Sequence, residues 1–266
     1  MLFDRREKYK IGTVPKGGCV LTAGVDVQND RIELEIVAWG RNLESWSVDY
    51  RVIYGKPTEP EVWNKLTAIL DENFESEDGR TLKINMLAID TGFSTQDVYA
   101  WVRAQSIHNV MAIKGVDNSL VPLNSPTKVD VNFRGKKIAN GVRLWKIGVS
   151  MIKGEFYGWL KQIRNEDGTS PRGYCHFPEY NTEYFKQLTA EQLVTKIVKG
   201  YPKREWQKIR DRNEALDCRV YARAAAIALG LERWSDDHFN KIAQMQAKET
   251  PQTQRPRVVR SKWMGR

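Results

Sequence analysis

Three aspartates that stand far apart in the chain carry the clearest chemical signal: Asp26, Asp90 and Asp217. Asp26 belongs to an alternating run, residues 21–27, in which apolar side chains occupy one face and Gly24 shares the other face with Asp26. We place Asp26 in the middle of a strand, close to the centre of a sheet. An unpaired carboxylate there is costly, so it needs a partner, a proton or a metal ion. The sequence favours the metal ion, with the other two aspartates as further ligands.

Such a cluster of carboxylates suits the hydrolysis of phosphodiester bonds. Hard oxygen ligands hold Mg²⁺ or Mn²⁺ and leave positions open for water and phosphate. Two ions roughly 3.5 to 4 Å apart would activate the attacking water and stabilise the leaving 3′ oxygen. Without metal the carboxylates would repel one another, so the pKa of one of them should rise. We therefore expect two divalent cations, Mg²⁺ or Mn²⁺, at Asp26, Asp90 and Asp217, with Asp26 as the bridging ligand.

Each carboxylate also has a purely structural explanation. Asp90 precedes a Thr-Gly pair and could form only an Asx turn that caps the next helix. Asp217 could be a first-turn aspartate that the helix dipole stabilises. Glu214 lies three residues earlier on the same helical face, so it could be a metal ligand, a group that supports a ligand, or a favourable charge at the helix start. Asp26 resists such an explanation best, because strands disfavour aspartate.

The charge balance points to a polyanionic partner. The chain carries 42 Lys and Arg against 33 Asp and Glu, a net charge of +9. Arg212, Arg219 and Arg223 share a helical face that could lie along a DNA backbone or simply face solvent, and we give the two interpretations equal weight. Lys114 closes a short apolar strand. We expect these four residues to position the DNA backbone rather than to read bases.

Several other classes of protein are disfavoured. Three cysteines, odd in number and far apart, do not suggest a disulfide framework or a cysteine zinc site, and the three histidines lack a metal-ligand spacing. No G-x-S-x-G or Cys/His nucleophile pattern is present. Residues 1–12 have no apolar signal-peptide core, and no stretch approaches the ~20 apolar residues of a membrane span. We expect a cytoplasmic protein without a membrane partner.

The elements that would position the aspartates follow the ribonuclease H order. Three antiparallel strands, a helix, a strand, a second helix and another strand are predicted at residues 21–27, 32–38, 44–53, 61–74, 84–90, 95–105 and 110–113, with Ser94 as the cap of the second helix. The predicted fold class is therefore α/β, a ribonuclease H-like mixed central sheet flanked by helices.

The rest of the chain completes this plan. Residues 116–140 are polar and turn-rich, which indicates an inserted ribbon. A strand, a helix, a hairpin on which Trp206 packs, and a long alanine-rich helix are predicted at residues 141–148, 150–163, 192–209 and 213–231. We divide the chain into a lead-in or linker remnant, a nuclease-like domain, an accessory helix and a disordered basic C-terminal tail, at residues 1–18, 19–234, 235–249 and 250–266.

Ordered short motifs add a resemblance to a known family. In chain order they are Gly24-Val25-Asp26-Val27-Gln28 with Asp30-Arg31, Trp39-Gly40, Glu44-Ser45-Trp46, Asp90-Thr91-Gly92, Ile113-Lys114-Gly115, His176-Phe177-Pro178, Gln187-Leu188-Thr189-Ala190-Glu191 and Asn213-Glu214-Ala215-Leu216-Asp217-Cys218. Together they resemble the nuclease domain of lambda-type phage terminase large subunits. The resemblance covers residues 20 to about 234.

The resemblance implies a metal-dependent endonuclease that cuts concatemeric viral double-stranded DNA at the start and end of genome packaging. It puts Asp26, Asp90 and Asp217 at the acidic-cluster positions and makes Glu214 a further candidate. It also implies the small terminase subunit and the portal as partners, and the host cytoplasm as the location. Such subunits carry an ATPase with a Walker A loop, which this sequence lacks, so we expect a separated nuclease domain or a truncated product.

Two alternatives stay open at this point. One is a junction resolvase or transposase of the same fold. The other is a DNA-binding or docking module without catalytic activity, in which the carboxylates are structural and the basic tail grips a partner. A structural cluster would show no gain in stability with Mn²⁺.

Overall fold

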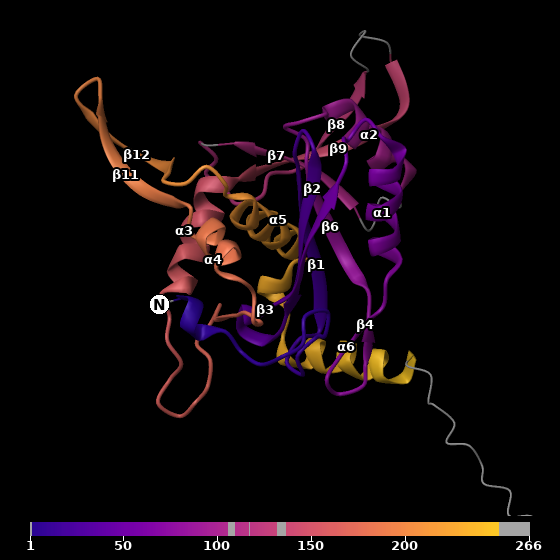
Figure 1. The fold of residues 1–266 in the computed structure, drawn as a ribbon, viewed down its shortest axis with the longest axis vertical. Coiled ribbons are helices and arrows are strands. Elements are labelled where there is room, and N and C mark those ends of the chain that lie inside the picture. The colour runs from indigo at the N-terminus through magenta and orange to yellow at the C-terminus, as the bar shows by residue number, and fades with distance from the viewer. Residues whose placement is uncertain (1, 106–109, 117, 132–136, 250–266) are drawn as a thin grey trace, which may run out of the picture.

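An eight-stranded mixed sheet forms the centre of the molecule (Figure 1). The computed structural model describes residues 2–105, 110–116, 118–131 and 137–249. In spatial order the strands of the sheet are β10 (Cys175–His176), β3 (Ser45–Tyr54), β2 (Arg31–Trp39), β1 (Val20–Val27), β6 (Ile84–Asp90), β7 (Val110–Val116), β9 (Lys137–Gly148) and β8 (Thr127–Val131). β1, β2 and β3 are antiparallel neighbours, whereas β1, β6, β7 and β9 run parallel. The predicted ribonuclease H order and fold class are confirmed.

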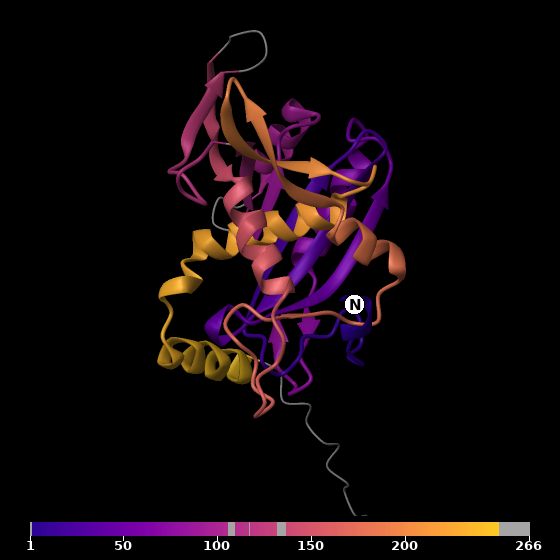
Figure 2. The same ribbon diagram turned by 90° about the vertical axis from the view of Figure 1, so that its left-hand side faces the viewer.

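Helices cover both faces of the sheet. The six α-helices of the described chain are α1 (Pro60–Asp71), α2 (Thr95–Ala104), α3 (Val149–Leu160), α4 (Thr182–Leu188), α5 (Glu214–Leu229) and α6 (Asp236–Glu249). α1 and α2 pack on one face, and α3, α4 and α5 pack on the other, which faces the viewer in Figure 2. The shorter elements are 3-10 helices at Leu2–Arg5, Arg41–Leu43 and Leu231–Arg233, and a small pair of strands, β4 (Phe74–Glu75) and β5 (Thr81–Leu82).

The alternation of β1 determines how α5 docks. Leu21, Ala23 and Val25 enter the core beneath α1 and α2. On the opposite face, the Thr22 hydroxyl donates to the carbonyl of Ala222 at 2.8 Å. A Cβ on Gly24 would lie 1.9 Å from the carbonyl oxygen of Cys218, so only glycine allows the α5 backbone to approach β1 this closely. The approach aligns the first turns of α5 with the end of β1.

The helices differ from the sequence expectations in three places. α1 ends at Asp71, three residues before the predicted end, and Phe74 lies in β4 instead. Ser94 stands at the N-cap position of α2, but with φ 47° its hydroxyl donates to the Asp97 carboxylate at 2.6 Å and makes no side-chain capping bond. α3 begins at Val149 and ends at Leu160, three residues before the predicted end, where the amide of Lys161 donates to the carbonyl of Gly158 and closes the last turn. The predicted insertion contributes β8 and part of β9, which extend the sheet beyond β7; residues 117 and 132–136 of it lie outside the described residues.

A two-stranded ribbon extends from the body on the side of α3 (Figures 1 and 2). It consists of β11 (Glu191–Val198) and β12 (Tyr201–Lys208), so the predicted hairpin is confirmed. Trp206 lies opposite Leu193 in the hairpin and also contacts α3. Its ring lies 4.9 Å from that of Tyr157, and its Nε1 donates to the Ser150 hydroxyl at 3.2 Å, so Trp206 ties the base of the ribbon to α3.

The residues before β1 and after α5 pack against the domain. Arg5 donates to the carbonyl of Leu160 at 2.8 Å, and Val14 is fully buried. In the segment after α5, Gln246 of α6 donates to the carbonyl of Cys19 at 2.7 Å. The proposed domain boundaries stay predictions, and the predicted tail, residues 250–266, lies outside the described residues. No helix of the described chain is long and apolar enough to cross a membrane.

Candidate active site

Two of the aspartates stand at the ends of neighbouring parallel strands. Val25 of β1 pairs with Ile89 of β6, so the residues that follow them, Asp26 and Asp90, occupy adjacent positions on the same face. The prediction of a mid-strand position for Asp26 is wrong. β1 ends one residue later, because the amide of Gln28 donates to the carbonyl of Arg31 and closes the turn into β2. The prediction of a central strand is correct, since β1 lies between β2 and β6.

The third aspartate arrives from α5. Asp217 lies in the first turn of this helix, one residue before Cys218, whose carbonyl touches Gly24 of β1. Burial and the negative charges of Asp217 and Asp90 together raise the pKa of Asp26 to about 7, while a hydrogen bond from the Gln28 side chain opposes the change. Asp90 and Asp217 therefore both lie within electrostatic reach of Asp26.

Asp90 also forms the Asx turn that was its structural explanation in the sequence. Its Oδ2 accepts a hydrogen bond from the amide of Gly92 at 2.8 Å, which is the Asx turn considered above. A Cβ on Gly92 would lie 2.7 Å from the same oxygen, so a larger residue here would make the Asp90 carboxylate shift. Burial raises the pKa of Asp90, although the amides of Thr91 and Gly92 and the charge of Lys114 counteract it. Asp90 thus belongs to the cluster and to the turn at once.

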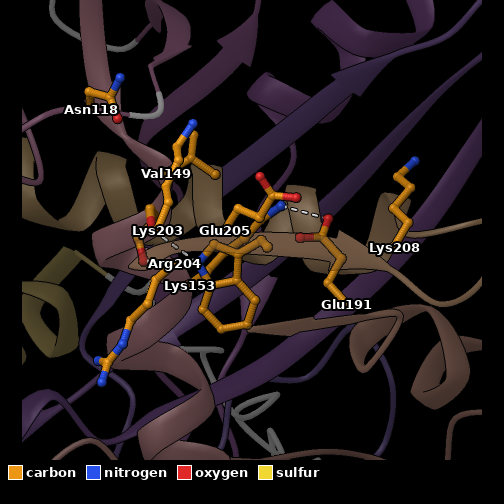
Figure 3. Close-up of a pocket in the computed structure, with 10 residues that line it drawn as sticks. Asn118, Val149, Lys153, Glu191, Lys203, Arg204, Glu205 and Lys208 are labelled. Carbon is orange, nitrogen blue, oxygen red and sulfur yellow. Dashed lines mark hydrogen bonds and ion pairs between the residues drawn. The ribbon is translucent and has the colours of Figure 1, made fainter. Parts of the chain in front are cut away.

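Asp217 is held by a lysine and an asparagine. Lys153 Nζ of α3 lies 3.2 Å from Asp217 Oδ1. The same atom lies 2.7 Å from Glu191 Oε1 (Figure 3). Asn213 Nδ2 donates to Asp217 Oδ2 at 2.8 Å and to Glu191 Oε1 at 2.9 Å. Burial raises the pKa of Asp217, and the positive charge of Lys153 lowers it. The cluster thus contains a fourth carboxylate and one ammonium group.

The metal prediction remains a prediction. With the side chains as they stand, no group of three or more His, Cys, Asp or Glu in the described chain is arranged to hold a metal ion. The donor chemistry of Asp26 and Asp90 nevertheless suits a divalent cation, because both are hard oxygen ligands in a buried, negatively charged site. On the side of Asp217, the ammonium group of Lys153 supplies a positive charge.

Glu214 is engaged elsewhere. Its Oε1 lies 2.6 Å from Arg31 Nη2, and its Oε2 lies 3.3 Å from Arg212 Nε. Both arginines also contact Glu33 of β2, at 2.5 and 2.6 Å. These ion pairs join the start of α5 to β2, so the structure gives Glu214 a role in positioning the helix that carries Asp217.

Comparison with known proteins adds to this geometry. Residues 1–237 match the family model described as "Terminase large subunit gpA, endonuclease domain". This chain belongs to that family. The terminase large subunit of Escherichia phage lambda is 31% identical over 255 residues, which cover 94% of this chain and 38% of that protein. The terminase large subunit of Enterobacteria phage P21 is 28% identical over 242 residues, which cover 89% of this chain and 36% of that protein.

The terminase-family chain therefore spans less than two fifths of the length of these two relatives. Among solved structures, the nuclease domain of the g2p large terminase of bacteriophage SPP1, a crystal structure with bound Mn, aligns with a TM-score of 0.36 at 9% identity. That alignment covers 79% of this chain and 94% of the other. The family predicted from the ordered motifs is confirmed by the family model and the two phage relatives.

Two arginines predicted to face DNA in this terminase-family chain are buried. Arg219 is 1% exposed and pairs with Glu35 at 2.7 Å. Arg223 is 3% exposed and pairs with Glu155 at 2.8 Å and Glu232 at 2.7 Å. The prediction is wrong for both, because α5 is enclosed by the sheet, α3 and α4 and has no solvated face at these positions. Their ion pairs satisfy charge inside the domain.

The other predicted DNA contacts are accessible. Lys114 is exposed in β7, and the side chain of Arg212 is 44% exposed just before α5. The structure also reveals basic residues that the sequence analysis did not single out. Lys203, Arg204 and Lys208 of β12 line a cavity of about 400 Å³ with Lys153 (Figure 3).

Lys153 and Glu191 are the two members of the cluster that sequence reasoning missed. Glu191 ends one of the motifs that carried the family resemblance, and this was the available signal. Lys153 stands in a helix with two glycines and an ordinary charge pattern, so nothing local distinguishes it from a surface lysine. Its importance depends on two partners that are distant along the chain, Glu191 and Asp217.

Proposed function

We propose that this chain is a metal-dependent endonuclease that hydrolyses phosphodiester bonds of double-stranded viral DNA during genome packaging. One observation carries the proposal: β1, β6 and α5 bring Asp90 and Asp217 close enough to the buried Asp26 that burial and their charges together raise the pKa of Asp26 to about 7. A buried cluster of acids with raised pKa values is typical of a functional site. Membership of the terminase endonuclease family supports it.

Asp26 and Asp90 would hold the divalent cations, Mg²⁺ or Mn²⁺, with Asp217 as the third ligand. Bound there, two ions would supply the positive charge that lowers the pKa of an attacking water and stabilises the leaving 3′ oxygen. The protein contributes the ligand positions. Adjacent strand ends hold Asp26 and Asp90, Gln28 orients the Asp26 carboxylate, and Asn213 orients Asp217. The products would be 5′-phosphate and 3′-hydroxyl ends.

Basic side chains beside the cluster would hold the DNA backbone. Lys114 is exposed in β7, beside the strand that carries Asp90, and Arg212 is exposed before the helix that carries Asp217. Lys203, Arg204 and Lys208 line the neighbouring cavity on the ribbon. Lysine and arginine on phosphates give affinity without reading sequence. We propose this set in place of the buried Arg219 and Arg223.

The context of the activity is proposed on family grounds. The relatives named terminase large subunit are more than twice as long as the part matched here. We propose the small terminase subunit and the portal as partners in packaging, and the host cytoplasm as the place of action. The experiments below ask only whether this chain cuts DNA.

Nicking of supercoiled plasmid in Mn²⁺ tests the proposal. Wild-type protein should convert the plasmid to open circles, and EDTA should stop the reaction. Asp26→Asn should lower the rate at least ~100-fold while the protein stays folded, because the bridging ligand is lost. Asp71→Asn, an exposed aspartate at the end of α1, is the matched control and should retain the wild-type rate.

Cleavage by Asp26→Asn at the wild-type rate would remove Asp26 from the reaction. If EDTA has no effect on cleavage, the proposed metal dependence is wrong. A preference for four-way junctions over linear duplex of the same sequence would instead indicate a resolvase of this fold.

A further inference from the structure

A buried lysine sits inside the acidic cluster. Lys153 is 6% exposed, and its ammonium group lies 2.7 Å from Glu191 Oε1 and 3.2 Å from Asp217 Oδ1. Glu191 is also buried, and Asn213 bridges the two carboxylates from the other side. The contacts join three elements that are distant in sequence: α3, the start of β11 and α5.

The position of Lys153 conflicts with full coordination of an ion by Asp217. Divalent ions bind carboxylate oxygens at about 2.0–2.6 Å. An oxygen that accepts a charged hydrogen bond from an ammonium group at 3.2 Å has that direction occupied. An ion placed beside it would also repel the ammonium charge at close range inside a poorly screened site. Lys153 and an ion on Asp217 Oδ1 are therefore competitors.

The cavity beside the cluster gives the ammonium group room to move. Lys153 itself lines the cavity of about 400 Å³, together with Glu205 and the basic residues of β12 (Figure 3). The lysine side chain is a flexible four-carbon stem, so its ammonium group can leave the carboxylates without a movement of α3. In the cavity, the ammonium group would occupy the space that we assign to the DNA backbone.

We propose that Lys153 is a positioning residue that serves as the internal cation of the acidic cluster, and that a divalent ion engaging Asp217 must displace it. The inference rests on the proposed metal-dependent function. With no ion bound, Lys153 holds Asp217 and Glu191 together against their repulsion. Ion binding at Asp217 then competes with an internal charge, which weakens the affinity for the metal on this side of the site.

The test is a titration of the whole chain with Mn²⁺, read by the electron paramagnetic resonance signal of free Mn²⁺ and by the midpoint of thermal unfolding. Lys153→Gln removes the charge and keeps a hydrogen-bond donor of similar reach. We expect a lower unfolding temperature than wild type in EDTA, a roughly tenfold smaller apparent Kd for Mn²⁺, and a larger rise of the unfolding temperature with Mn²⁺. Lys161→Gln, at the exposed end of α3, is the matched control and should behave as wild type.

An apparent Kd for Mn²⁺ in Lys153→Gln equal to or larger than that of wild type would overturn the inference, because Lys153 would then be only a structural ion-pair partner. If Lys153→Gln does not fold, the double variant Lys153→Met with Glu191→Gln decides by the same criterion. It removes the ammonium group and one carboxylate together, and the new amide oxygen at position 191 can still accept from Asn213. Wild-type protein that neither binds Mn²⁺ nor nicks plasmid would overturn the proposed function and this inference with it.

Discussion

Asp26→Asn should change how the stability of the metal-free protein depends on pH. Burial and the neighbouring carboxylates raise the pKa of Asp26 from an ordinary value of 3.8 to about 7 in the folded protein. The unfolded chain releases this proton at lower pH than the folded chain does. The free energy of unfolding therefore falls as the pH rises from about 4 to about 7, and the asparagine variant lacks this loss.

The size of the effect follows from the two pKa values. The Asp26 side chain is only 5% exposed and is poorly screened by solvent, so the full change in its pKa contributes to the free energy of unfolding. Relative to the unfolded chain, the raised pKa of Asp26 costs the folded protein roughly 2 kcal/mol at about pH 5, where Asp26 keeps its proton, and roughly 4 kcal/mol at about pH 8. The gain in stability from Asp26→Asn should thus be about 2–3 kcal/mol larger at the higher pH. For a chain of this size that corresponds to about 5–10 °C in the unfolding midpoint.

Urea unfolding in EDTA at the two pH values, followed by tryptophan fluorescence, measures the difference. Asp71→Asn is again the control, because this aspartate is exposed. A difference between wild type and Asp26→Asn that is the same at both pH values would refute the electrostatic reasoning. With Mn²⁺ at saturating concentration near pH 8, wild type should gain stability and Asp26→Asn should gain much less, because the ion takes over the role of the proton.

Three further substitutions test the surrounding structure. Gly24→Ala should destabilise the protein by about 1–3 kcal/mol or more and abolish nicking. The new Cβ would lie 1.9 Å from the Cys218 carbonyl and push α5 away from β1. Urea unfolding measures the loss of stability, and the plasmid assay measures the loss of nicking. Arg219→Met should cost about 3–5 kcal/mol in urea unfolding by leaving Glu35 buried without its partner. DNA affinity per folded molecule should not change in that variant. Lys208→Gln should leave the free energy of unfolding unchanged. It should reduce the slope of the logarithm of DNA affinity against the logarithm of salt concentration by about one, measured by fluorescence anisotropy.

Local patterns predicted the elements of the fold well. Residues 21–27 alternate between apolar and polar side chains, which specifies a strand because successive side chains of any strand point to opposite faces. Residues 84–90 are almost all apolar, which is typical of a parallel strand that is buried on both faces. The order of these elements then restricts the topology to few possibilities. For that reason the central strands and their helices lie where the sequence placed them.

Side-chain environments on α5 could not be predicted in the same way. Arg219 and Arg223 fall on a face that would be solvated on an isolated helix, and most arginines on such a face are. Here the helix lies between the sheet and the helices α3 and α4, so the same face is an interior surface. Buried carboxylates such as Glu35 become visible as partners only once β2 lies beneath α5.

The sequence by itself determined the strands and the helix that carry Asp26, Asp90 and Asp217, and it predicted that these three carboxylates form one site. Asp26 stood out because strands disfavour aspartate, Asp90 because it ends an apolar strand, and Asp217 because it falls near the start of a predicted helix. Only the tertiary structure decided what balances their charge. Lys153 and Glu191 reach Asp217 from separate elements, and electrostatic energy depends on distance through space, which the distance along the chain does not reveal.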